Sequence, residues 1–345
     1  MPVVAAAVTA VTFGSKPGTP VLIVAGLLLG GSVLAAVHHA EVVAHRVGEP
    51  FGSLVLAVAV TVIEVALIVT LMTSGGDETA TLARDTVFAA VMITCNGVVG
   101  LSLLVGALRR RVATFNAEGS ATALATVLTL ATLTLVLPTF TTSRPGPEFS
   151  PGQLAFAAIA SIALYGLFVV VQTVRHRDYF LPESEPGEHA APPSDRAALI
   201  SLGLLVVALV AVVGLAKLES EPIEDAVSSI GAPQSAVGVL IALLVLLPET
   251  LAAVRNARRN RVQTSFNLAF GSAMASIGLT IPVIAVASIW LEGPLELGLG
   301  AMQMVLLAIT AVVGALTVLP GRATVQEGGV HFVLFLAFVF LALNP

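Results

Sequence analysis

Two glutamates, Glu64 and Glu249, lie inside long apolar segments of the sequence. An acidic side chain at the centre of a bilayer costs about 2.5–3.5 kcal/mol on insertion scales, and such residues usually line a pathway for ions or protons. Two carboxylates together neutralise a divalent cation, and Ca²⁺ takes oxygen ligands that include carboxylates and backbone carbonyls. The pair therefore predicts a binding site for a hard cation within a membrane.

The same two side chains are expected to bind protons. Once the cation leaves, burial and like-charge repulsion both favour the protonated form of a carboxylate. Cation and proton then compete for the same oxygens. This competition exchanges one ion for the other and needs no separate proton relay. Pro248, directly before Glu249, should locally disrupt its helix and free carbonyls for coordination. Neighbouring segments offer further neutral oxygens, on Thr94, Asn96, Ser272 and Ser276. The alternative role of these side chains is to hydrogen-bond or pack between helices.

The composition indicates an α-helical protein that crosses a membrane many times. Of 345 residues, 57% are hydrophobic and 11% are charged, whereas an ordinary soluble domain carries roughly 25% charged residues. This excludes a soluble enzyme. The net charge of −5 provides no basic surface for nucleic acid, and one cysteine provides no disulfide or cysteine-based zinc site. The expected partners are the lipid bilayer and the transported ions, with no cofactor.

Ten apolar stretches are long enough to cross the hydrocarbon core, which needs about 20 residues. We expect an all-α membrane protein with a first five-helix repeat at 18–174, an acidic cytoplasmic linker at 175–196 and a second five-helix repeat at 197–345. Residues 1–17 form an N-terminal stub whose apolar part is too short to span. The predicted spans are 18–37, 51–73, 86–107, 121–138, 153–174, 197–216, 234–253, 264–290, 298–319 and 330–344.

Matching features relate the two halves of the chain. Glu64 and Glu249 are 185 positions apart. In the helix that follows each glutamate, three residues match three others at a separation of 182: Asp85, Phe88 and Met92 with Asn267, Phe270 and Met274. Because five is an odd number, the second half must enter the membrane from the opposite side. This is the inverted repeat of secondary transporters, whose sites lie near the bilayer midplane.

Basic residues orient the chain in the membrane. With the N-terminus outside, twelve Lys and Arg of the loops face the inside and four face the outside. The linker is then cytoplasmic, and we expect a multi-pass protein of the bacterial cytoplasmic (inner) membrane. The acidic segment 219–225 lies outside, where it either concentrates external cations or is a solvated loop.

A second polar cluster lies near the end of the first predicted span and consists of His38, His39, Glu41 and His45. It lacks the His-Glu-x-x-His spacing of a zinc site. Histidine titrates near neutral pH, so the cluster is a candidate sensor of cytoplasmic pH. A solvated helix end is the alternative.

Several longer stretches carry a family resemblance. They are HAEVVAHRVGEPFGSL at 39–54, VIEVALI at 62–68, LLPE at 246–249, NLAFGS at 267–272 and IGLTIP at 277–282. These stretches resemble bacterial ChaA-type calcium/proton antiporters, which belong to the calcium/cation antiporter superfamily.

The resemblance implies two inverted five-helix repeats whose first and sixth helices slide across a core to give alternating access. It implies one cation- and proton-binding glutamate in each repeat, and these map onto Glu64 and Glu249. Ser272 maps onto a Gly-Ser motif, and Asn96 maps approximately onto a polar position in the third helix. Members are also described as moving Na⁺ or K⁺, so Na⁺(K⁺)/H⁺ exchange through the same pair is the alternative.

An intramembrane enzyme is the alternative from a different functional class. It would need a nucleophile–base pair, an aspartate-rich diphosphate site or a histidine metal site, and the predicted spans contain none, since His331 is isolated. A receptor or structural role leaves the paired glutamates unexplained. We therefore expect an antiporter, not an enzyme, that exports Ca²⁺ against H⁺. Its expected cation ligands are Glu64, Glu249, Asn96, Ser272 and Ser276.

Overall fold

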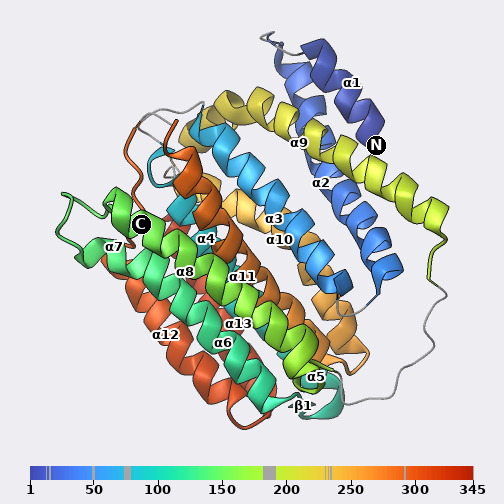
Figure 1. Ribbon diagram of the computed structural model, residues 1–345, viewed down its shortest axis with the longest axis vertical. Helices are drawn as coiled ribbons and strands as arrows, with labels where there is room; N and C mark the ends of the chain where they lie inside the picture. Colours follow the sequence, from blue (N-terminus) through green and yellow to red (C-terminus); the bar gives the residue numbers. More distant parts are fainter. Residues whose placement is uncertain are drawn as a thin grey trace.

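The computed structural model is a bundle of long helices (Figure 1). Ten helical segments of the described chain are long and apolar enough to cross a membrane, which confirms the predicted all-α membrane protein with ten spans. The structure describes residues 1–12, 14, 17–48, 51–73, 79–181, 192–229, 231, 233, 235–290 and 293–344. The acidic residues Glu183, Glu185 and Glu188 of the predicted linker lie outside these ranges, as do the side chains of the acidic segment after Glu219.

The first half of the chain contains α1 (Pro2–Thr12), α2 (Thr19–Val47), α3 (Phe51–Met72), α4 (Leu82–Met92), the π-helical segment η2 (Ile93–Val98), α5 (Val99–Arg110), β1 (Ala113–Thr114), α6 (Ala117–Ala131), the π-helical segment η3 (Thr132–Val136), α7 (Leu137–Phe140), α8 (Pro151–Val170), the π-helical segment η4 (Val171–Arg175) and the 3₁₀ helix η5 (Arg177–Phe180). The second half contains α9 (Asp195–Ser229), α10 (Ser235–Arg258), α11 (Val262–Ala287), α12 (Ala301–Val318), β2 (Arg322–Ala323) and α13 (Val325–Leu343).

The buried apolar side chains form two separate clusters. The larger one fills the bundle made by the segments from α4 to α8 and by α10 to α13. The smaller one joins α1, α2 and α9 to the facing sides of α3 and α10. Figure 1 shows α2 and α9 side by side at one edge of the molecule, with α3 and α10 between them and the larger bundle. The molecule thus consists of a helical core and a thinner layer held to it by apolar contacts.

Two helices are longer than predicted. Helix α2 continues to Val47, where the prediction ended near residue 37, and α9 continues to Ser229. The prediction stopped at the first polar residues, but a helix persists where such residues leave the hydrocarbon region. The 29 residues of α2 correspond to about 43 Å, more than the roughly 30 Å of hydrocarbon. The cluster of three histidines and Glu41 therefore occupies the last turns of a continuous helix.

Residues 2–12 of the predicted stub form an ordered helix. Helix α1 packs mainly on α9 and also on α2. At Gly214 of α9 an added Cβ would lie 2.0 Å from Thr9, so glycine is required for this close approach. With 11 residues, α1 is about 17 Å long and too short to span, as the sequence predicted.

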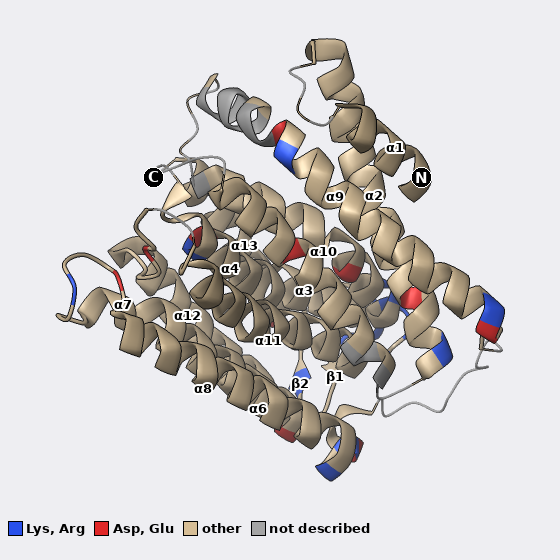
Figure 2. Cartoon of the chain, turned by 45° about the horizontal axis from the view of Figure 1, so that its top comes forward, with Lys and Arg blue, Asp and Glu red and all other residues tan. Residues whose placement is uncertain are grey.

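Loops assigned to the same side of the membrane meet in space. At one end β1 pairs with β2, and Arg46 donates to the carboxylate of Asp195. At the other end the backbones of Glu148 and Glu296 form an isolated bridge. Figure 2 shows most charged residues near helix ends and loops, with long uncharged stretches between them. This arrangement agrees with the alternation of loops derived from the basic residues.

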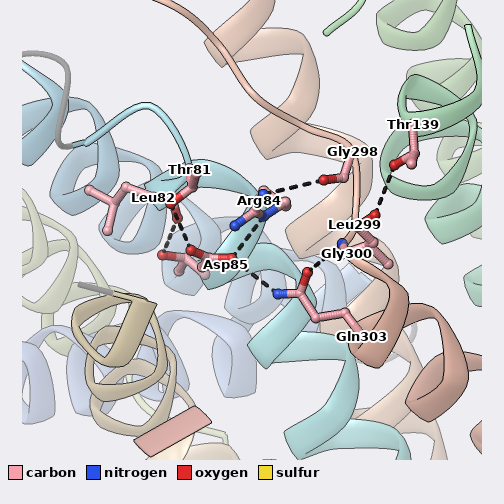
Figure 3. A network of polar contacts seen from close by, with 10 residues as sticks. Thr81, Leu82, Arg84, Asp85, Thr139, Gly298, Leu299, Gly300 and Gln303 are labelled. Carbon is pink, nitrogen blue, oxygen red and sulfur yellow. Dashed lines mark hydrogen bonds and ion pairs between the residues drawn. The ribbon is translucent and has the colours of Figure 1, made fainter. Parts of the chain in front are cut away.

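A polar network ties the two repeats together at the predicted outer end (Figure 3). The carboxylate of Asp85 accepts from Arg84 Nε at 2.8 Å, from Thr81 Oγ1 at 2.8 Å and from Gln303 Nε2 at 3.2 Å. Arg84 Nη1 also donates to the carbonyl of Gly298 at 3.3 Å. Because Gln303 and Gly298 belong to the second repeat, this network fixes the start of α4 to the start of α12.

The predicted counterpart of Asp85 makes a similar connection at the other end. Asn267, near the start of α11, donates to the carbonyl of Phe180 at 2.6 Å and accepts from Gln263 Nε2 at 2.9 Å. Gln263 Oε1 in turn accepts from the backbone N–H of Asn116, before α6. Each repeat therefore anchors the start of its central helix to a segment of the other repeat or to the connection between them.

We expect Asp85→Ala to lower the free energy of unfolding by about 3 kcal/mol, because it leaves the largely buried guanidinium of Arg84 without its carboxylate. Thermal or denaturant unfolding in detergent measures the change. The matched control is Glu148→Ala, which removes a more exposed ion pair with Arg144 and should cost about 1 kcal/mol or less. Equal losses in the two variants would contradict the anchoring role of the network.

Candidate functional site

The two intramembrane glutamates come from corresponding helices of the two repeats. Glu64 lies on α3 and Glu249 on α10, and their exposed fractions are 2% and 6%. Both helices pack against α11. The carboxylates are therefore buried in protein rather than exposed to lipid or to bulk water.

One face of α11 receives both carboxylates. Ser276 Oγ donates to Glu64 Oε1 at 2.6 Å, and Ser272 Oγ donates to Glu249 Oε2 at 2.5 Å. The two serines are four residues apart, so they stand on the same side of the helix with a rise of about 6 Å between them. Side chains that are 185 positions apart in the sequence thus converge on adjacent turns of a third helix.

Among the described residues, no salt bridge neutralises the two glutamates. The salt bridges of the described residues involve other carboxylates, namely Asp85, Glu148 and Asp195. Serine hydroxyls supply dipoles but no positive charge, and the two carboxylates lie on adjacent turns of one face of α11. Two bare carboxylates this close in a low-dielectric interior repel each other and lose hydration. A bound cation or bound protons would relieve both penalties.

A narrow crevice, with no room for a water molecule, lies beside Glu249 and Ser272. Thr94 contributes the other polar side chain of its lining, and the rest is apolar: Val98, Leu246, Leu268 and Ala269. Thr94 lies in η2, where π-helical hydrogen bonding interrupts the third span, and such turns often occur at functional sites. At the separation of 182 that relates the repeats, Thr94 is the counterpart of Ser276. Each glutamate thus has a hydroxyl-bearing residue of the opposite repeat in its neighbourhood.

The expected break at Pro248 is not present. Helix α10 continues from Ser235 to Arg258 through this proline. Proline within a membrane helix removes one backbone N–H, and packing by neighbouring helices preserves the helix around it. The backbone irregularity near the site lies instead in η2, for which the sequence contains no proline or other recognisable signal.

The structure places Asn96 in a different set of contacts from the glutamates. Its Nδ2 donates to Thr310 Oγ1 at 2.9 Å, and its Oδ1 faces His331 Nδ1 at 3.1 Å. The side chain of His331, which the sequence suggested was isolated, is 1% exposed and also contacts Thr317. Residues this far apart in sequence show no local pattern that would connect them. Ser272 and Ser276 contact the glutamates, whereas Asn96 does not hydrogen-bond to either.

Comparison with known proteins gives a consistent family assignment. The family model described as sodium/calcium exchanger protein matches residues 18–174 and 200–344. The chain is 48% identical to the putative ionic transporter y4hA of Sinorhizobium fredii, over 94% of this chain and 89% of that protein. It is 36% identical to the sodium-potassium/proton antiporter ChaA of Escherichia coli, over 95% and 91%. It is 25% identical to the Ca²⁺/H⁺ antiporter of Aphanothece halophytica, over 88% and 86%.

Solved structures share the fold at low sequence identity. The structure of native YfkE superposes with a TM-score of 0.74 at 15% identity and covers 99% of this chain and 98% of that chain. The H⁺/Ca²⁺ exchanger CAX superposes with a TM-score of 0.71 at 18% identity, over 98% and 87%. These similarities support the ten-span inverted-repeat architecture.

We expect Ser272→Ala and Ser276→Ala each to lower the free energy of unfolding by about 1–3 kcal/mol, because a buried carboxylate then loses its hydrogen-bond donor. Unfolding of the detergent-solubilised protein without added cations measures this. The matched control is Ser161→Ala, since this buried hydroxyl donates only to a carbonyl of its own helix. A loss in the control as large as in the site variants would mean that the serine–glutamate contacts contribute no specific stabilisation.

Proposed function

Because this chain belongs to the sodium/calcium exchanger protein family, we propose that it is a cation/proton antiporter that exports Ca²⁺ from the cytoplasm in exchange for H⁺. The observation that carries the proposal is the convergence of Glu64 and Glu249 on adjacent turns of α11. Membership of a transporter family implies transport rather than catalysis. The relative from Aphanothece halophytica, a Ca²⁺/H⁺ antiporter by name, supports this choice of cation.

The two carboxylates act as a common site for the cation and for protons. When both are ionised, their charge balances that of Ca²⁺, and when the cation has left, each takes up a proton to remove the uncompensated charge. Binding of one substrate therefore requires release of the other. Ser272 and Ser276 remain hydrogen-bond donors to the carboxylates in both states, which keeps the oxygens in position.

Neutral oxygens complete the coordination of the cation. Ca²⁺ usually takes six to eight oxygen ligands, more than two carboxylates provide. We assign further ligands to the hydroxyls of Ser272 and Ser276, to Thr94 at the edge of the crevice and to water. Asn96, which the sequence also suggested as a ligand, is assigned here to a supporting role, because its amide is engaged by Thr310 and His331.

Alternating access requires one part of the protein to move relative to another. The thin layer formed by α1, α2 and α9 has its own apolar cluster and meets the core through α3 and α10. An interface of this kind lets helices slide with little change in hydrogen bonding. We propose that α2 and α9 move across the core, and that they expose the glutamate pair to each side in turn.

Exchange of Na⁺ or K⁺ for H⁺ at the same pair is the second candidate. It is favoured by the 36% identity to a sodium-potassium/proton antiporter. A monovalent cation would need only one ionised carboxylate, while the other keeps its proton. For both candidates we propose a location in the bacterial cytoplasmic membrane, with the linker on the cytoplasmic side.

The decisive experiment uses inverted membrane vesicles with an acidified interior and follows the collapse of the pH gradient when Ca²⁺, Na⁺ or K⁺ is added. We expect Ca²⁺ at low concentration to collapse the gradient. Glu64→Gln and Glu249→Gln should abolish the response, because a neutral amide neither balances the cation nor exchanges a proton. Glu148→Gln, which changes a loop carboxylate, is the matched control and should respond like the wild type. Full exchange in either site variant would disprove the mechanism.

The pH dependence distinguishes the two candidate substrates. Lowering the pH on the cation side should weaken cation binding, because protons occupy the same oxygens. In the range where both carboxylates are protonated, displacement of two protons raises the apparent KM about 100-fold per pH unit, and displacement of one raises it about tenfold. Initial rates at several pH values measure the slope. A slope near two supports Ca²⁺ exchange, whereas an apparent KM that does not change with pH contradicts a shared site.

A further inference from the structure

A buried polar network lies next to the glutamate site and supplies no cation ligand to the exchange described above. It consists of Asn96, Thr310, Thr317 and His331, and we refer to it as the α13 network. Its four side chains are at most 2% exposed. The contacts run from Thr310 through Asn96 and His331 to Thr317, at 2.9, 3.1 and 3.1 Å. The network therefore connects the third span to α12 and α13.

The hydrogen bonds determine which nitrogen of His331 carries the proton. Thr310 Oγ1 donates to the carbonyl of Leu306 at 2.7 Å, so it can only accept from Asn96. The Asn96 amide group therefore faces Thr310, and its oxygen faces His331 Nδ1, which must donate. In the neutral ring Nε2 then accepts from the hydroxyl of Thr317. All polar groups of the network are satisfied by a neutral histidine with its proton on Nδ1.

His331 meets the third span where its helical hydrogen bonding changes. In an α-helix the N–H of Val99 would pair with the carbonyl of Cys95, but here it is directed to Thr94 and Asn96. Asn96, whose side chain contacts His331, thus belongs to the segment in which the helical hydrogen bonding changes.

Glycines allow α13 to approach this segment very closely. An added Cβ at Gly100 would lie 2.8 Å from the backbone nitrogen of Phe332, and one at Gly328 would lie 2.7 Å from that of Leu104. An added Cβ at Gly97, inside η2, would lie 3.1 Å from the ring of Phe335, a tight but less severe contact. The backbones of α5 and α13 are therefore in direct contact on both sides of His331, which leaves little room for η2 to shift.

We propose that His331 is a positioning residue for the cation site, because it holds η2 through Asn96 and thereby places Thr94 beside Glu249. The inference rests on the proposed function and names a residue outside the coordination shell. Its support is that Thr94, Cys95 and Asn96 are consecutive. Their side chains serve different purposes, since Thr94 lines the crevice of the glutamate site while Asn96 binds His331.

Two polar substitutions separate the two contacts of the ring. In His331→Asn the amide nitrogen occupies the position of Nδ1 and still donates to Asn96. In His331→Gln the amide reaches the position of Nε2, near Thr317, and the contact with Asn96 is lost. Thr317→Val removes the second contact alone. The matched control is Tyr165→Phe, because Tyr165 of α8 packs on Gly278, the counterpart of Asn96 in the second repeat.

Two readouts test the proposal, and one of them is independent of transport. Cys95 is the single cysteine, it is 2% exposed, and it lies within η2. Its rate of labelling by N-ethylmaleimide in membranes reports how often η2 opens. The second readout is the apparent KM for Ca²⁺, or for whichever cation the wild type transports, in the vesicle assay.

We expect His331→Gln to raise both the apparent KM and the labelling rate about tenfold, the equivalent of one buried hydrogen bond. His331→Asn, Thr317→Val and Tyr165→Phe should stay within about twofold of the wild type. The proposal is overturned if His331→Asn is as impaired as His331→Gln, if Thr317→Val is impaired, or if labelling changes without a change in KM. Absence of exchange in the wild type would refute the proposed function, and labelling would still decide whether His331 holds η2.

Discussion

The structure depends on the cost of keeping two carboxylates inside a membrane protein. Glu64 and Glu249 are buried, and the salt bridges of the described residues do not include them. A bound cation or bound protons would remove the cost of such a pair, and the proposed exchange mechanism depends on this requirement. Two hydroxyls of α11, one turn apart, donate hydrogen bonds to the two carboxylates, which belong to different repeats.

In the remaining architecture, polar contacts fix parts of the core, whereas a second layer is attached mainly by apolar side chains. The polar network around Asp85 and the contacts of Asn267 fix the starts of α4 and α11 at opposite ends of the core. The layer of α1, α2 and α9 is attached mainly through apolar side chains. Directional hydrogen bonds resist displacement, whereas apolar surfaces of similar shape can slide. The division between the two clusters is the one that the proposed movement of α2 and α9 across the core would require.

Much of this could be predicted from the sequence, because membrane spans are defined by a strong signal. The number of spans followed from apolar length, and the glutamate pair followed from the rarity of charge inside a span. Other features had no such signal. The π-helical segment η2 packs against α13, and the hydrogen bond between Asn96 and His331 joins residues that are 235 positions apart. The continuity of α10 through Pro248 likewise depends on neighbouring helices rather than on the local sequence.

The repeats are alike in topology but not in their chemistry. In the second repeat the central helix α11 is a regular α-helix whose serines contact both glutamates. In the first repeat the corresponding helix is interrupted, and its positions equivalent to Ser272 and Ser276 are Ala90 and Thr94. Thr94 donates its hydroxyl to Ala90 of its own helix at 2.7 Å rather than to a carboxylate. The regular helix thus hydrogen-bonds to both carboxylates, whereas the hydroxyl of the interrupted helix bonds to its own main chain. The two glutamates therefore have different surroundings, although they lie on corresponding helices of the two repeats.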